Sequence, residues 1–202
     1  MSGADLLLFN LALLASWLSP GPAFLVVTQT TLANGRRAGM AAALGLALTA
    51  SIWTLAALLG LGILFEVVPW AATALRIAGA TYLIWIAIET WRSARAPLTS
   101  TPEVQRRALQ RGVLVNLGNP KSILFAASVL VVIFPPNLGW LEVATITANH
   151  LLLELVLYAA LTALLARPAV ARGYARLKTA FDRIAAGVMG TLGLRLAFGS
   201  DQ

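Results

Sequence analysis

Two ionisable residues, Lys121 and Glu154, lie deep inside long apolar stretches of this 202-residue chain. A lysine at the centre of a bilayer costs roughly 2.5–3.5 kcal/mol on insertion scales, so it needs a partner or a water-filled cavity. An ammonium close to a carboxylate keeps that carboxylate ionised. These two residues could fix the register of two helices as a static pair, exchange a proton, or bind a charged small molecule.

Prolines interrupt the same apolar stretches at a similar depth. The segment SPGPAF places Pro20, Gly21 and Pro22 in the middle of one stretch, and GNPKS places Pro120 directly before Lys121. A proline has no backbone N–H, so a carbonyl about one turn earlier loses its helical partner. Irregular backbone at membrane depth is tolerated only inside protein or beside water. A kink explains each break alone, but their shared depth predicts two broken helices around one polar site.

Further polar residues surround these breaks. Asn116 and Asn119 precede the second break, and Asn149 lies more than one turn outward of Glu154, where it could line the same path. The single histidine, His150, is nearer the outer side, where packing is favoured over a proton relay. The candidate binding or coupling residues are Pro20, Gly21, Pro22, Asn116, Asn119, Pro120, Lys121, Asn149 and Glu154.

Other classes of chemistry lack their signatures in the sequence. The chain has no cysteine and one histidine, and it contains no metal-ligand spacing, phosphate-binding loop or nucleophile–base set. We therefore expect neither a metal nor a cofactor, and we do not expect an enzyme.

The elements that must position these residues are membrane-spanning helices. Charged residues make up 11% of the chain and hydrophobic residues 59%, whereas soluble domains carry about 25% charged residues. The apolar stretches exceed the roughly 18–20 residues that cross a bilayer. We predict an all-α integral membrane protein with six transmembrane helices. The expected spans are residues 6–32, 38–65, 70–91, 110–134, 142–166 and 182–199.

The basic residues alternate between connections. They gather after the first span, between the third and fourth spans, and between the fifth and sixth, whereas residues 66–69 and 135–142 contain no lysine or arginine. The positive-inside rule then places the basic loops in the cytoplasm and both termini outside. The net charge of +7 is a topology signal, with some attraction to membrane lipid. Nucleic acid is not an expected partner.

The chain divides into two halves with a short similarity. RIAGA at residues 76–80 recurs as RIAAG at residues 183–187, although so short a match also arises by chance. Three spans per half would make the halves inverted repeats, a plan common among secondary transporters. We predict one membrane domain over residues 1–202, with a first repeat at 1–91, a cytoplasmic linker at 92–109 and a second repeat at 110–202. Gly39 and Gly45 permit close helix contact, and such small-residue faces make a homodimer possible.

Three segments resemble a known family in their order and spacing. They are SPGPAFLVVTQTTLANGRRAGMAAALG at 19–45, GATYLIWIAIETWR at 79–92 and RGVLVNLGNPKSILF at 111–125. Together they resemble the LysE/RhtB family of amino-acid exporters over nearly the whole chain. The resemblance implies a multi-pass bacterial inner-membrane protein that exports amino acids or related small metabolites, driven by the proton-motive force.

The resemblance also assigns residues. The family's conserved motifs fall on Pro20, Gly21, Pro22, Asn116, Asn119, Pro120 and Lys121, and its intramembrane acid falls on Glu154. Two places in the sequence depart from the family pattern: residues 131–133 read Val-Val-Ile where members often have Pro-Gln-Phe, and Thr49 replaces a frequent glycine. These changes fit a less polar site and argue against a cationic substrate such as lysine.

The leading hypothesis is a secondary exporter that works by alternating access, with a midplane site between the two broken helices. Unwound backbone offers amides to a carboxylate and carbonyls to an ammonium, which suits a zwitterion. Lys121 would attract the carboxylate or pair with Glu154, and Glu154 would bind the amine or exchange a proton. The alternatives are a channel-like or ion-handling protein, which would need a continuous polar stripe, and a non-transporting scaffold, which would tolerate substitution of both residues.

Overall fold

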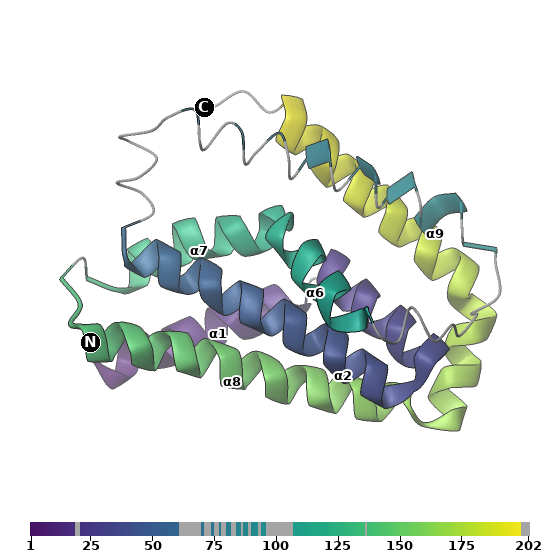
Figure 1. Cartoon of the computed structure of the whole chain (residues 1–202), viewed down its shortest axis with the longest axis horizontal. Coiled ribbons are helices and arrows are strands. Elements are labelled where there is room, and N and C mark those ends of the chain that lie inside the picture. Colours follow the sequence, from purple (N-terminus) through teal and green to yellow (C-terminus); the bar gives the residue numbers. More distant parts are fainter. Residues whose placement is uncertain are drawn as a thin grey trace.

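The computed structural model describes residues 1–18, 21–60, 107–135 and 137–198, together with scattered positions between residues 70 and 95. Within this part of the chain all regular structure is helical, which confirms the expected all-α class. The prediction of six spans stays a prediction, because much of the third expected span lies outside the described residues. The helices are α1 Gly3–Leu18, α2 Pro22–Leu58, α6 Ala108–Leu117, α7 Pro120–Ile133, α8 Trp140–Leu165 and α9 Pro168–Phe198 (Figure 1).

Helix α2 is a helical hairpin and not one straight rod. Gly35 has φ 82° and ψ 171°, a conformation that glycine adopts with little steric cost. A Cβ built on Gly39 would lie 2.0 Å from Thr31 Oγ1, whereas residues eight apart in a straight helix are separated by about 12 Å along the axis. The chain therefore reverses at Gly35 (Figure 1). The part of α2 before the reversal continues the first expected span, and the part after it forms the second.

Both predicted helix breaks are present in the backbone. Gly21, between α1 and α2, is extended with φ −131° and ψ −171°. Asn119, between α6 and α7, is extended with φ −82° and ψ 105°. Pro22 and Pro120 are the first residues of the helices that follow, a position where no backbone N–H is needed. Pro20 lies outside the described residues. The first and fourth expected spans each consist of two helices joined by a break.

The two broken spans run in opposite directions. Phe9, in the first half of α1, packs against Phe134 just beyond α7, with ring centroids 5.7 Å apart. Further along α1, Ser16 meets Lys121 at the start of α7. Helix α1 is therefore antiparallel to α7. Inverted repeats would have this orientation, and the symmetry of the two halves stays a prediction.

Helices α2 and α6 touch backbone to backbone. A Cβ on Gly45 would lie 2.2 Å from the Leu109 carbonyl oxygen, and a Cβ on Gly112 would lie 2.1 Å from the Ala42 carbonyl oxygen. The predicted close contact of the second span is thus confirmed, and it is made within one chain. Because this small-residue face is already covered, it gives no support to the homodimer considered from the sequence.

Helix α8 has one buried stripe and an apolar outer face. Its buried residues recur every three or four positions and are Val143, Ile146, His150, Glu154, Tyr158, Thr162 and Leu165. Leu152 and Val156 point away from this stripe and are 62% and 64% exposed. Two described helices, α2 and α8, are long and apolar enough to cross a membrane. Exposed apolar side chains of this size are typical of surfaces that contact another apolar phase.

The helix that carries the last expected span begins earlier than predicted. The sequence places its start at residue 182, but α9 already begins at Pro168. The bounds 182–199 of the membrane span itself stay a prediction. The basic residues in this stretch interrupt the apolar pattern and so imitate a loop. The helix accommodates the charged pair Lys178 and Asp182 because residues four apart lie on one helix face and the two side chains form an ion pair.

A polar cluster explains why this polar part of α9 is ordered. Asp182 is fully buried and accepts hydrogen bonds from Gln29 Nε2 at 3.1 Å and from the Tyr174 hydroxyl at 3.2 Å. Lys178 Nζ lies 2.8 Å from the other Asp182 oxygen and donates to the Ala94 carbonyl at 3.1 Å. Burial and the neighbouring carboxylate raise the pKa of the Tyr174 hydroxyl, so it stays protonated and donates. The cluster ties α9 to the first half of the chain.

The α2–α6 contact gives a test of the fold. We expect Gly112→Ala to destabilise the protein by about 1–3 kcal/mol, because overpacking forces two backbones apart. Gly173→Ala in α9 is the matched control, since a Cβ there meets nothing within 4 Å. Thermal unfolding in detergent, followed by size-exclusion chromatography, compares the two variants. Equal midpoints would contradict the backbone contact.

Candidate functional site

Lys121 connects the two helix breaks. Its Nζ donates a hydrogen bond to the backbone carbonyl of Ser16 at 2.5 Å. In an unbroken helix this carbonyl would accept from residue 20, which is a proline and has no N–H. The lysine side chain also passes Gly21, where an added Cβ would lie 3.7 Å from Lys121 Cδ. A side chain at the second break therefore satisfies the backbone of the first.

The second break is satisfied in a similar way. Pro120 removes the N–H that would bond to the Asn116 carbonyl in a continuous helix. That carbonyl instead accepts from the Trp53 indole Nε1 of α2 at 3.2 Å and from the Asn119 backbone N–H at 3.3 Å. Both carbonyls freed by proline thus receive a donor from a side chain on another segment.

The two asparagines hold the second break in shape. Asn119 Oδ1 accepts from the Lys121 backbone N–H at 3.2 Å, which caps the start of α7. Asn119 Nδ2 donates to Asn116 Oδ1 at 3.1 Å, and Ser122 Oγ donates to the same oxygen at 2.6 Å. Asn116 Nδ2 donates to the Leu46 carbonyl at 2.7 Å. These hydrogen bonds make Asn116 and Asn119 a rigid support beside Lys121.

A cavity of about 60 Å³ lies where the two breaks meet α8. At roughly 10–15 Å³ for each water, it has room for about four to six water molecules. Its polar lining comes from Ser16, Lys121, Ser122, His150 and Glu154, among others. Its apolar lining includes Leu13, Trp17, Phe24 and Phe125. A cationic and an acidic side chain therefore share one small and largely apolar space.

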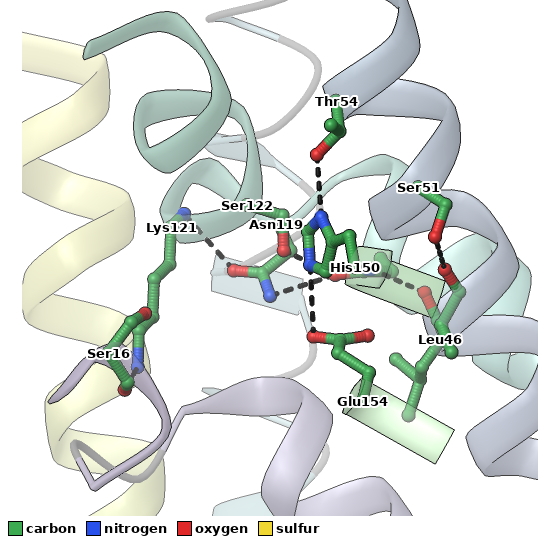
Figure 2. Close-up of polar contacts among 11 residues, drawn as sticks. Ser16, Leu46, Ser51, Thr54, Asn119, Lys121, Ser122, His150 and Glu154 are labelled. Atoms are coloured by element: carbon green, nitrogen blue, oxygen red, sulfur yellow. Dashed lines mark hydrogen bonds and ion pairs between the residues drawn. The ribbon is translucent and has the colours of Figure 1, made fainter. Parts of the chain in front are cut away.

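Glu154 and His150 approach this cavity from the same side of α8 (Figure 2). They are four residues apart, so they lie on one helix face, and they are 8% and 3% exposed. His150 Nε2 lies 3.7 Å from Glu154 Oε1, which is too long for a hydrogen bond. The other ring nitrogen, Nδ1, lies 2.6 Å from the Thr54 hydroxyl of α2. Within the described residues, His150 Nε2 and Glu154 Oε2 have no hydrogen-bond partner.

The structure brings most of the predicted residues together. Gly21, Asn116, Asn119, Lys121 and Glu154 all line the cavity. Pro22 and Pro120 begin the two flanking helices, while Pro20 lies outside the described residues. Asn149 is not part of the lining, because its Nδ2 donates to Asn10 Oδ1 of α1 at 2.6 Å.

The sequence favoured a packing role for His150 and left it out of the candidate residues, but it lines the cavity. The signal that could have found it is its spacing from Glu154, because an i, i+4 pair in a helix shares one face. We find no group of three potential metal-ligating side chains among the residues that the structure describes.

Comparison with known proteins identifies the family of the chain. The profile of LysE type translocators matches residues 14–200, a range that contains both breaks, Lys121 and Glu154. The chain belongs to the LysE family of translocators. Family membership confirms the resemblance seen in the three motif segments and makes the protein a transporter and not an enzyme. It also implies a bacterial inner-membrane protein.

Several LysE-family relatives resemble the chain over most of their length. The threonine efflux protein of Salmonella typhi is 30% identical over 95% of this chain and 97% of its own length. The threonine efflux protein of Escherichia coli K12 is 31% identical over 89% of this chain and 90% of its own. The homoserine/homoserine lactone efflux protein of Salmonella typhimurium LT2 is 34% identical over 91% of this chain and 84% of its own length. No solved structure matches the chain.

The bond from Trp53 to the second break gives a test of this LysE-family site. We expect Trp53→Phe to destabilise the protein by about 1 kcal/mol, because the Asn116 carbonyl loses one of its donors. Trp140→Phe is the matched control, since Trp140 is 81% exposed. Thermal midpoints in detergent measure the difference. Identical midpoints for the two variants would show that the indole N–H does not support the break.

Proposed function

We propose that this translocator exports a small zwitterionic amino acid or a closely related metabolite, bound in the cavity between the two broken helices. The observation that carries the proposal is the shared cavity of Lys121 and Glu154 at the junction of the breaks. Relatives named for threonine and homoserine efflux support the same substrate class. Both of these amino acids carry one ammonium, one carboxylate and an uncharged side chain.

The lining of the cavity suggests how such a substrate is held. Lys121 would attract the carboxylate, and Glu154 would bind the ammonium, because each offers the opposite charge in a small and largely apolar space, where charges are screened less than in bulk water. The apolar wall at Trp17, Phe24 and Phe125 would contact the substrate side chain. A second ammonium on the substrate would have to be buried against this wall, so a dibasic amino acid is disfavoured.

Export would be driven by protons and would proceed by alternating access. Glu154 is buried in the cavity, and its carboxyl could carry the coupling proton when it releases the ammonium. The antiparallel course of α1 and α7 supports two inverted halves, residues 1–91 and 110–202, that rock about the site and are joined by a linker at 92–109. The two helix breaks would allow this movement without loss of hydrogen bonds in a regular helix.

A flux measurement tests the proposal. Purified protein in liposomes should move labelled threonine or homoserine against an imposed pH gradient, and lysine much less. We expect Lys121→Met and Glu154→Gln each to lower this flux by tenfold or more, since each loses a charge-assisted contact worth about 1.5–3 kcal/mol.

Glu142→Gln is the control for these variants. Glu142 lies in the first turn of α8, the helix that also carries Glu154, and it does not line the cavity. It should keep wild-type flux. Absence of amino-acid flux in the wild type, or wild-type flux in both cavity variants, would refute the proposed function.

We further propose that both termini and the α7–α8 connection face the periplasm. The amino group of Met1 forms an ion pair with Glu142 at the start of α8, which puts the N-terminus on the same side as that connection. The turn of the α2 hairpin contains Gly35, next to Arg36 and Arg37, and it lies at the far end of the helices from the N-terminus (Figure 1). This separation is the one that the positive-inside rule predicts.

Cysteine labelling checks this topology, because the chain has no native cysteine. In intact cells a membrane-impermeant maleimide should label Asn137→Cys, in the exposed connection after α7. Arg106→Cys, in the basic linker, should be labelled only after the inner membrane is permeabilised. The reverse pattern would overturn the orientation.

A further inference from the structure

His150 is held in a fixed orientation between two helices. Its Nδ1 lies 2.6 Å from the Thr54 hydroxyl of α2, and Thr54 is fully buried. A hydroxyl can both donate and accept a hydrogen bond. Thr54 can therefore satisfy Nδ1 whether or not that nitrogen carries a proton, and its contact aims Nε2 at Glu154 (Figure 2).

His150 and Glu154 each have a buried polar atom without a hydrogen-bond partner among the described residues. These atoms are His150 Nε2 and Glu154 Oε2. A buried polar atom without a partner is destabilising, so these two atoms favour a bound water or proton. The separation of 3.7 Å between Nε2 and Oε1 closes with a small side-chain shift or is bridged by one water molecule. The geometry is that of a pair that can pass a proton.

Two aromatic rings pack against the imidazole. The Phe9 ring of α1 meets it in a T-shaped arrangement with centroids 5.5 Å apart, and the Phe125 ring of α7 lies 6.2 Å away in a tilted one. Such aromatic contacts help to hold the imidazole in one orientation. Among titratable groups, Lys121 from α7 and Tyr158 from α8 line the same cavity, while α2 contributes the neutral Thr54.

Building on the proposed function, we propose that His150 is a second coupling residue and that Thr54 is its positioning residue. A proton arriving from outside binds Nε2 of the neutral imidazole. It then passes to the Glu154 carboxylate, so the N–H bond breaks, a carboxyl O–H bond forms, and both groups become neutral. Neutral Glu154 no longer attracts the substrate ammonium, which leaves toward the outside.

The direction of transfer follows from the position of the two residues on α8. His150 precedes Glu154 by one helical turn, about 6 Å along the axis. Helix α8 starts, in the proposed topology, at the outer face. An incoming proton therefore reaches His150 before it reaches Glu154, and proton entry is linked to substrate release on the outer side.

Two transport assays in liposomes separate this role from substrate binding. Gradient-driven flux requires net proton movement, whereas counterflow at equal pH exchanges labelled for unlabelled threonine without it. For His150→Gln we expect a loss of gradient-driven flux of about 100-fold, the usual range for removing a proton-transfer group. Counterflow should stay within about threefold of the wild type, because the charges on Lys121 and Glu154 remain.

Thr54 supplies a pair of matched variants. Thr54→Ser keeps the hydroxyl and should retain gradient-driven flux. Thr54→Val keeps the shape but loses the bond to Nδ1, and it should lower gradient-driven flux about tenfold, as expected for a misplaced acid–base group. Thr145→Val, an exposed position on α8, is the control for a lost hydroxyl.

The outcomes distinguish the two proposals. Wild-type protein that shows no counterflow of any amino acid overturns the proposed function. If the wild type shows counterflow, the role of His150 is refuted when His150→Gln keeps its gradient-driven flux, or when it loses both activities equally. Should His150→Gln fail to fold in detergent, equal gradient-driven flux in Thr54→Ser and Thr54→Val would refute the proposal.

Discussion

A backbone carbonyl that loses its helical donor inside a membrane must find another donor, and the arrangement of this protein depends on two such carbonyls. Proline at position 20 frees the carbonyl of Ser16, and Pro120 frees that of Asn116. Lys121 Nζ satisfies the first and Trp53 Nε1 the second. Because each donor comes from another segment, the breaks persist only while α1, α2 and α7 stay together. The shape of the site therefore depends directly on how the helices pack.

The glycines of α2 and α6 determine whether these donors reach their acceptors. Gly45 and Gly112 bring the two backbones together, and this contact places Trp53 and the Leu46 carbonyl beside Asn116. A wider separation would leave a buried asparagine without its acceptor, at a cost of about 1–3 kcal/mol. The tight packing therefore supports the second break directly, and through Lys121 it supports the first.

The sequence predicted those features that depend on local chemistry and depth. A proline within an apolar stretch breaks a helix wherever the stretch lies, and an intramembrane charge must face a partner, so the breaks and the meeting of Lys121 with Glu154 at one cavity were foreseeable. The rotation of each helix about its own axis could not be predicted from the sequence. Asn149 and His150 are adjacent in α8, but Asn149 contacts α1 while His150 lines the cavity. The early start of α9 was missed because Asp182 and Lys178 find their partners far away in the sequence.

Lys121 has to reconcile a structural and a functional demand at the same atom. Its ammonium has three N–H donors, and one of them bonds to the Ser16 carbonyl. In the proposed function, the same ammonium also attracts the carboxylate of the substrate. A neutral side chain could bond to the carbonyl but would not attract the carboxylate, and an arginine would spread its charge over a planar group too wide for this small cavity. The compact charge of lysine suits both demands, so the residue that supports the first break is also the one that we propose binds the substrate.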